Sequence, residues 1–223
     1  MKRSMAGTLL LCAAIVLVLF YLFGCGASTP QPTAEGDAPT HLAQGRQHLD
    51  EGRIAEAIAE FQTAIRLDPR SVEAHFRLGN AYFEQGELDN AAKEFLKALE
   101  LEPDNVDARS NLGAVYYEQA QFDKAATEFG RAISLNPQDA DIPYHLGATY
   151  VQQAKYDASI AEFREALRLD PKLARAYYGL GNAYKLQGRN REAIEALEEF
   201  LTMNEDAQLQ AIAEGLLDEL KGP

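Results

Sequence analysis

The four histidines are the residues most able to do chemistry at neutral pH, as proton carriers or as zinc ligands. His41 and His48 share a helical face but lie seven residues apart, too far for two ligands of one zinc ion. After residue 24 the sequence has no phosphate-binding loop, metalloprotease helix, nucleophile elbow or cysteine–histidine pair. The sequence therefore predicts no catalytic, metal or cofactor site, and we expect a non-enzymatic protein.

The carboxylates are numerous, but they are spread along the chain. The sequence holds 34 acidic and 21 basic residues, for a net charge of −13. All the acidic residues and 19 of the basic ones follow residue 24, so that part carries 19 minus 34, or −15. Such a surface repels phosphates, which excludes nucleic acid as a partner. We expect most of these carboxylates to lie on solvated helical surfaces.

A repeat of 34 residues sets the elements that must position any functional side chain. Glycines and prolines recur at this spacing: Gly45, Gly79, Gly113, Gly147 and Gly181, then Pro69, Pro103, Pro137 and Pro171. A fixed period of this length is typical of stacked helical arrays, in which one unit cannot bury its apolar face alone. Length therefore counts repeat units here, and a single globular core is not expected.

Each unit reads as two antiparallel helices. In the second unit, apolar and small residues recur at helical spacing, first at Leu78, Gly79 and Tyr82 and then at Ala91, Phe95 and Ala98. Gly86 falls between the two helices, where a residue without Cβ can adopt positive φ. Pro103 cannot continue the second helix and so ends it.

These residues resemble the tetratricopeptide repeat, whose pattern of Leu-Gly, Tyr, Ala, Phe and Pro they match. The resemblance implies an all-α, right-handed superhelical solenoid of about five helix hairpins. His41, His48 and His75 occupy aromatic slots of the repeat, so we expect them to pack. The predicted units are residues 38–71, 72–105, 106–139, 140–173 and 174–207, followed by a capping helix and tail at 208–223.

The resemblance also implies a concave groove lined by the first helix of each unit. The predicted groove residues are Arg46, Phe76, Arg77, Asn80, Phe83, Asn111, Tyr117, Tyr144, His145, Tyr178, Asn182 and Lys185. Aromatic rings give buried area and amides pair with a peptide backbone, so this set favours a protein or peptide partner. The alternative is that some of these rings only pack between neighbouring helices.

Some relatives clamp the terminal carboxylate of a peptide with two asparagines and three cations. Asn80 and Asn111 match the amide positions, but Phe76, Asp141 and His145 stand where the cations belong. Asp141 would repel a carboxylate. We therefore do not expect the partner's chain end to be recognised.

The first 24 residues have the composition of a signal peptide or a membrane anchor. Lys2 and Arg3 precede an apolar run from Leu9 to Phe23, which fits an export signal and could also form a hydrophobic spanning helix. Gly24 and Cys25 resemble the bacterial lipobox, in which the cysteine is lipidated after cleavage. Lipidated Cys25 is the preferred interpretation, and an uncleaved anchor is the alternative.

Both interpretations place the array outside the cytoplasm. No basic residue lies between Arg3 and Arg46, so the positive end stays inside. Residues 25–37 are rich in Ala, Thr, Pro and Gly, which predicts a flexible linker. The expected location is the bacterial envelope, anchored in a membrane and facing the periplasm or the exterior.

Together these features predict a membrane-tethered scaffold that binds protein or peptide partners and assists assembly of an envelope complex, such as a pilus or secretion system. The alternatives are a self-associating structural repeat protein and an adaptor that delivers clients to an envelope protease. Lipidated arrays of both assembly and adaptor types share this plan. The oligomeric state and the partner's identity stay open, because the repeat pattern determines how the helices pack and does not specify a binding partner.

Overall fold

The structure is a computed structural model that describes residues 36–203 and 207–222. Within these residues every regular element is an α-helix. The helices are α2 (Ala38–Asp50), α3 (Ile54–Leu67), α4 (Val72–Glu84), α5 (Leu88–Leu101), α6 (Val106–Glu118), α7 (Phe122–Leu135), α8 (Asp141–Gln152), α9 (Tyr156–Leu169), α10 (Ala174–Leu186), α11 (Asn190–Thr202) and α12 (Ala207–Lys221). The predicted signal segment, Cys25 and most of the linker lie outside the described residues.

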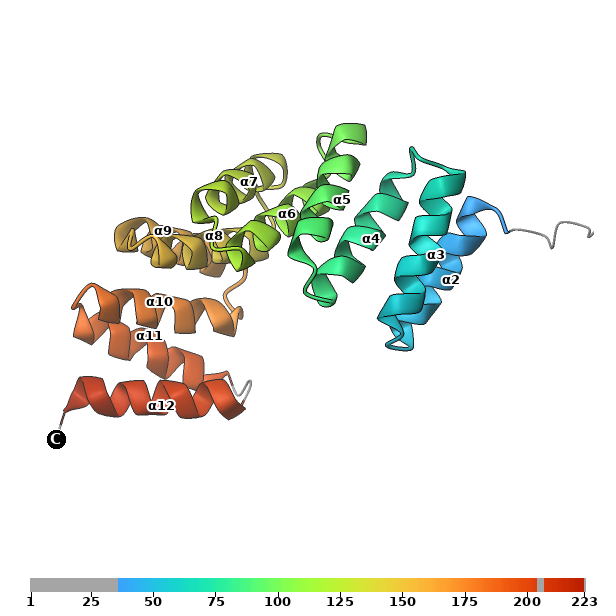
Figure 1. Cartoon of the computed structure of the whole chain (residues 1–223). Coiled ribbons are helices and arrows are strands. Elements are labelled where there is room, and N and C mark those ends of the chain that lie inside the picture. The colour runs from blue at the N-terminus through green and yellow to red at the C-terminus, as the bar shows by residue number, and fades with distance from the viewer. Residues whose placement is uncertain (1–35, 204–206, 223) are drawn as a thin grey trace, which may run out of the picture. The chain divides into compact units, whose positions relative to one another are not determined.

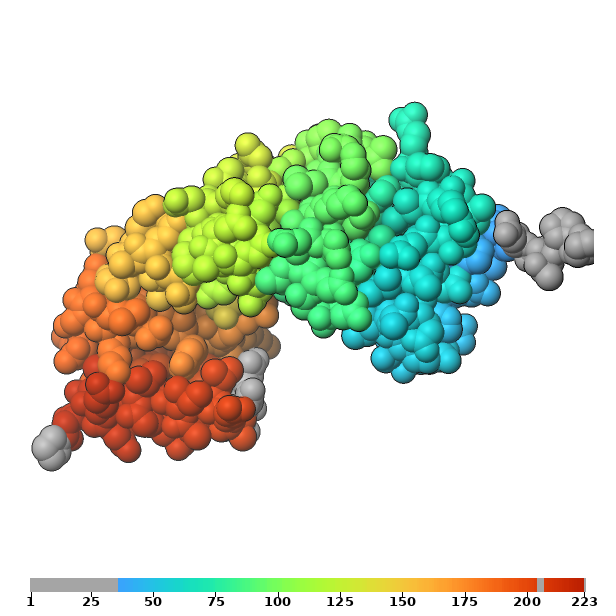
Figure 2. All heavy atoms as spheres, in the orientation of Figure 1, coloured from blue at the N-terminus to red at the C-terminus, as the bar shows by residue number. Residues whose placement is uncertain are grey.

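The helices pair into five successive hairpins, from α2/α3 to α10/α11, and α12 packs against α11 (Figure 1). Each second helix also packs on the first helix of the next hairpin. On the face shown in Figure 2, the side chains of neighbouring hairpins form a continuous surface along the row. The expectation of an all-α solenoid of helix hairpins is therefore confirmed, while its handedness stays a prediction.

The first helices lie closer to one another than the second helices do. α4 contacts α6, α6 contacts α8, and α8 contacts α10, although a second helix separates each pair in the sequence. Stacked hairpins whose first helices approach one another place those helices on the inner side of the stack. We call the row formed by α4, α6, α8 and α10 the inner row.

A close fit between a glycine and a bulky side chain holds each hairpin together. A Cβ added to Gly79 would lie 2.7 Å from the ring of Phe95, and one at Gly113 would lie 2.9 Å from Phe129. The same fit occurs between Gly45 and Phe61 and between Gly147 and Phe163, and Leu197 takes the ring's place against Gly181. Because the glycine has no side chain, the second helix can approach the backbone of the first.

These rings also join one hairpin to the next. Phe95 is fully buried in a cluster that includes Ala108, Leu112 and Val115 of α6. Burying one such ring contributes about 1.5–3 kcal/mol relative to exposure. The core is therefore a series of linked clusters that cross every boundary between hairpins.

A polar pair repeats along the hairpins and is broken in the fourth. A His or Arg of the first helix contacts a Glu of the second in the pairs His41–Glu60, His75–Glu94 and Arg109–Glu128. In the fourth hairpin Pro143 occupies the position of the cation, and no described residue pairs with Glu162. Burial raises the pKa of Glu162, and the nearby Glu165 adds to this effect. The fifth hairpin replaces both partners, with Tyr177 and Ala196.

The helix α12 caps the array through one apolar stripe. Ala213 and Leu217 are buried against Leu197 and Phe200, as the predicted capping helix requires. Ile212 of the same helix is 45% exposed. It lies at the edge of the stripe, about 100° around the helix from Ala213, because successive helical residues are rotated by that angle.

The turns inside the hairpins require a left-handed residue. Gly86 has φ of 80°, as the sequence predicts, and Gly52 and Gly188 are similar. Ala120 and Ala154 adopt φ of 56° at the equivalent positions. A residue with a Cβ is strained there, by roughly 1–2 kcal/mol.

Replacing Ala120 by glycine should therefore stabilise the array. We expect Ala120→Gly to raise the free energy of unfolding by about 0.5–1 kcal/mol, because the relief of strain exceeds the extra chain entropy of glycine. Urea denaturation measures the change. Ala59→Gly, at an exposed position inside α3, is the control and should lower stability by about 0.5–1 kcal/mol. Equal losses in both variants would contradict the assignment of strain to Ala120.

Candidate interaction surface on the first helices

All twelve predicted groove residues lie on first helices. Arg46 is on α2, and the other eleven are on α4, α6, α8 and α10, the helices of the inner row. Arg46 is exposed, and the remaining eleven are partly exposed. The side chains differ in what they contact, which divides them into surface groups and packing groups.

Two arginines meet one carboxylate at the junction of α2 and α4. Arg46 Nη1 lies 3.4 Å from Glu73 Oε1, and Arg77 Nε lies 3.6 Å from the same oxygen. The guanidinium carbon of Arg77 is 6.0 Å from the ring centre of Phe76. Three groove candidates, Arg46, Phe76 and Arg77, are thus gathered here around Glu73, which sequence reasoning missed, and Asn80 lies one turn further along α4.

Two asparagines meet at the next junction, between α4 and α6. Asn111 Nδ2 donates a hydrogen bond of 2.8 Å to Asn80 Oδ1. An asparagine side chain has two donors and two acceptor lone pairs, so this one bond leaves donor and acceptor capacity on both amides. The pair can therefore still bind the backbone of an incoming peptide.

Tyr144 and His145 are mainly packing groups. The Tyr144 ring lies 5.8 Å from Phe163, and the His145 ring stacks on Phe129 at 5.7 Å. Burial raises the pKa of Tyr144 and lowers the pKa of His145, and the charge of Arg175 lowers the latter further. For these two residues the structure matches the alternative in which rings fill the space between helices.

The C-terminal groove candidates are tied to neighbouring helices. Tyr178 packs on Phe200, with ring centres 5.6 Å apart, and Lys185 Nζ lies 2.6 Å from Glu219 Oε2 of α12. Asn182 lies on α10 between these two residues. This end of the surface is therefore charge-balanced and partly covered by α12.

Tyr117 and Phe83 complete the set. Tyr117 contacts Phe122 edge to face at 5.6 Å, and its hydroxyl accepts a hydrogen bond of 3.4 Å from Gln152. Phe83 packs on the cluster that surrounds Phe95. Both rings remain partly exposed. Phe83 is on α4, the helix of Asn80, and Tyr117 is on α6, the helix of Asn111.

Sequence reasoning missed the partners that neutralise these side chains. Glu73 and the Asp141–Arg175 ion pair bridge consecutive first helices, and Glu219 joins α10 to the capping helix α12. Asp141 and Arg175 are separated by one full period of 34 residues. The repeat spacing could have suggested such a pair, but only the stacking geometry shows which side chains meet.

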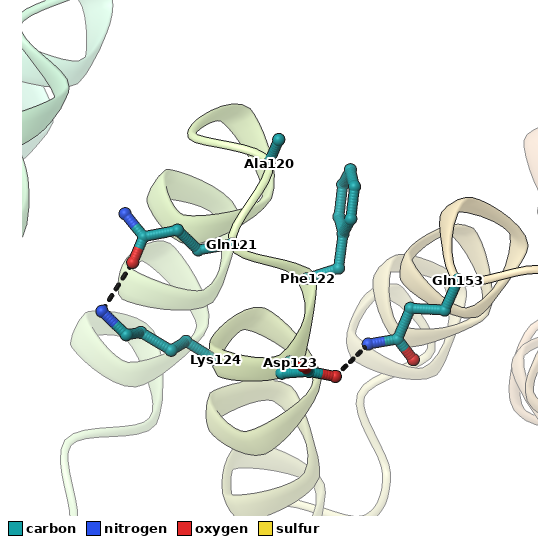
Figure 3. Close-up of a pocket in the computed structure, with 6 residues that line it drawn as sticks. All are labelled: Ala120, Gln121, Phe122, Asp123, Lys124 and Gln153. Carbon is teal, nitrogen blue, oxygen red and sulfur yellow. Dashed lines mark hydrogen bonds between the residues drawn. The ribbon is translucent and has the colours of Figure 1, made fainter.

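A separate hollow lies at the turn between α6 and α7 (Figure 3). It has a volume of about 340 Å³ and is lined by Phe122, Asp123 and Gln153, among others. Gln153 Nε2 donates to Asp123 Oδ1 at 2.9 Å, and the same Gln-to-Asp bond recurs at Gln119–Asp89 and Gln187–Asp157. The recurrence identifies this contact as a joint between repeats rather than a specific ligand site.

The described residues offer no inorganic centre. In 36–203 and 207–222, no group of three or more His, Cys, Asp and Glu side chains is placed to hold a metal ion. Among the same residues, none of the helices combines the length and the apolar character needed to cross a bilayer. The surface on the first helices is thus the strongest candidate for a functional site.

Comparison with known families identifies the repeats. Four family profiles, all of the tetratricopeptide repeat, match residues 42–106, 83–143, 149–188 and 174–206. The chain carries tetratricopeptide repeats. Proteins of this family are typically non-enzymatic and interact with other proteins.

Solved structures of tetratricopeptide-repeat proteins share the fold. A crystal structure of MamA is 26% identical, with a TM-score of 0.69, over 75% of this chain and 92% of that one. A MamA segment from Desulfovibrio magneticus RS-1 is 24% identical, with a TM-score of 0.72, over 76% and 97%. YrrB, described as a TPR protein with an unusual peptide-binding site, is 24% identical, with a TM-score of 0.67, over 80% and 92%. No curated protein matches the chain significantly.

The environment of His145 makes the stability of the repeats depend on pH. Because its pKa is lowered in the folded state, the unfolded chain takes up the proton first as pH falls below about 6.5. The contribution of neutral His145 is therefore complete above that pH and is lost on acidification. We expect His145→Phe, which preserves the stack on Phe129, to lose less stability between pH 7 and pH 5 than the parent protein.

Urea denaturation at several pH values measures this difference. The other three histidines are present in both proteins, so their effects cancel in the comparison. Parallel stability curves for the two proteins would contradict the assigned role of His145.

Proposed function

We propose that this protein is a membrane-tethered, extracytoplasmic scaffold that binds a protein or peptide on the exposed side of its first helices. The observation that carries the proposal is the inner row, whose helices together present Phe83, Asn80, Asn111 and Tyr117 with unused polar and apolar surface. Such a mixture suits an extended or helical peptide. The description of YrrB as a peptide-binding TPR protein supports the same reading of the fold.

The tether follows from the sequence before the repeats. Lys2, Arg3 and the apolar run from Leu9 to Phe23 are typical of an exported segment. We propose that Cys25 is lipidated and that residues 25–37 form the spacer to the array. In that position the scaffold would meet partners of the bacterial envelope and assist assembly of a complex such as a pilus or a secretion system.

Self-association is the second candidate. Ile212 on α12 is 45% exposed at the C-terminal end of the array, and a large exposed apolar side chain there favours contact with another protein surface. A second copy of the chain is one protein that could cover it. The two candidates differ in the surface used, the first helices in one case and α12 in the other.

Co-purification from detergent extracts tests the proposal. A tagged full-length protein is expressed beside an untagged copy, and bound proteins are identified by mass spectrometry. We expect an envelope protein to be recovered and to be lost with the double variant Phe76→Ala, Arg77→Glu. The matched control is Leu96→Ala, Lys97→Glu, which makes the same kinds of change on the exposed side of α5.

The outcomes separate the two candidates. Loss of the partner in the α4 variant but not in the α5 variant supports binding on the first helices. Equal recovery in both variants contradicts it. Recovery of the untagged copy alone, abolished by Ile212→Ser, would support self-association instead.

A further inference from the structure

Pairs of residues face one another across consecutive first helices. The hydrogen bond between Asn80 and Asn111 shows that two positions 31 residues apart meet at the junction of α4 and α6. The repeat of 34 residues carries this geometry to the other junctions. The equivalent pairs are Arg46 with Arg77, Ala114 with His145, and Ala148 with Gly179.

The chemical character of these pairs changes along the row. The first pair is cationic, the second is a pair of amides, and the last two contain no permanent charge. Burial keeps the pKa of His145 below its ordinary value, so that ring is neutral at pH 7. Among these four pairs, positive charge therefore gathers only at the junction of α2 and α4.

The charge of the first pair is only half compensated. Arg46 and Arg77 both approach a single oxygen of Glu73, at 3.4 and 3.6 Å, whereas a charge-assisted hydrogen bond measures about 2.7–2.9 Å. The side chains of Arg46 and Arg77 are 50% and 38% exposed. Two cations share one anion, which leaves one positive charge at this junction.

A donor at this junction is also unused. Arg77 Nε is buried and makes no hydrogen bond. Arg175 Nε is likewise buried without a hydrogen bond, but Arg175 Nη2 is paired with Asp141 and Lys185 Nζ with Glu219, one cation to one anion in each case. The junction of α2 and α4 therefore lacks one acceptor that carries a negative charge.

We infer that Arg46 and Arg77 receive an aspartate or glutamate side chain of an extended peptide, whose backbone continues onto the Asn80–Asn111 pair. The inference rests on the proposed function and names the partner's chemistry: an acidic segment within a peptide rather than its terminal carboxylate. Packed helices lie roughly 8–10 Å apart and an extended chain advances about 3.3 Å per residue. The acidic residue thus sits about three residues from the peptide group that the amides bind.

Selection from a displayed library of random dodecapeptides tests this inference. The full-length protein in detergent is the target, with the double variant Arg46→Gln, Arg77→Gln and the control Lys93→Gln, Lys97→Gln on α5. Both variants remove two cations, so the net charge is matched. Circular dichroism and the urea midpoint verify that each variant is folded.

We expect one position of the selected peptides to be enriched in Asp or Glu with the parent and with the α5 control, but not with Arg46→Gln, Arg77→Gln. Selected peptides should bind that variant about ten-fold more weakly or worse, because it lacks the charge-assisted hydrogen bonds. Binding to the parent should weaken at high salt.

The single variant Glu73→Gln supplies a test of opposite sign. It removes the internal carboxylate that competes for both arginines and leaves the arginines themselves in place. We expect acidic peptides to bind this variant several-fold more tightly than the parent. Unchanged or weaker binding would overturn the inference, because the internal carboxylate would not then be a competitor.

The remaining outcomes distinguish this inference from the function on which it rests. Peptides without acidic enrichment that still lose binding with Phe76→Ala would overturn the acidic partner and leave the interaction surface intact. If peptides selected on the Arg46→Gln, Arg77→Gln variant were still enriched in Asp or Glu, the assigned site would be wrong. An equal loss of this enrichment with the α5 control would also overturn the assigned site. Failure to enrich any peptide on the parent would count against both.

Discussion

The fit of one bulky side chain against one glycine is the constraint on which each hairpin depends. Phe95, seated against Gly79, brings the second helix close to the backbone of the first, and the other four hairpins repeat the arrangement with Phe or Leu. The other side of the same ring meets the following hairpin. One side chain therefore fixes both the geometry within a hairpin and the stacking between hairpins.

The stacking in turn creates the candidate site. Asn80 and Asn111 are far apart in the sequence and meet because two first helices contact each other. At the preceding junction, between α2 and α4, stacking likewise brings Arg46 to the carboxylate of Glu73 that Arg77 also approaches. The surface is thus a product of the array, and a single isolated hairpin would contain only half of each pair.

The sequence predicts the scaffold well because its signals are local and periodic. The spacing of the glycines, the prolines and Phe95 predicts helix pairs, and Gly86 predicts the turn. Ala120 could not be recognised as a left-handed residue, because alanine is common in helices and only the 34-residue register marks its position.

Within the candidate site, residue type predicted position but not role. Tyr144 was predicted to face a partner, yet its ring packs on Phe163. Glu73, which no motif marks, lies close to both Arg46 and Arg77. Contacts of this kind depend on neighbouring repeats, whose relative placement is not written in the local pattern. The tether at Cys25 lies outside the described residues and stays a prediction.

The most direct measurement of the central claim compares two glycines near the same ring. A Cβ at Gly113 would lie 2.9 Å from the ring of Phe129, whereas Gly130, in α7, has open space around it. Urea denaturation measures the free energy of unfolding, and hydrogen exchange measures the local protection of α6 and α7. We expect Gly113→Ala to lower the free energy of unfolding by about 1–3 kcal/mol through overpacking. Gly130→Ala should instead stabilise it by about 0.5–1 kcal/mol. Equal stabilisation by both substitutions would contradict the seated ring as the basis of the array.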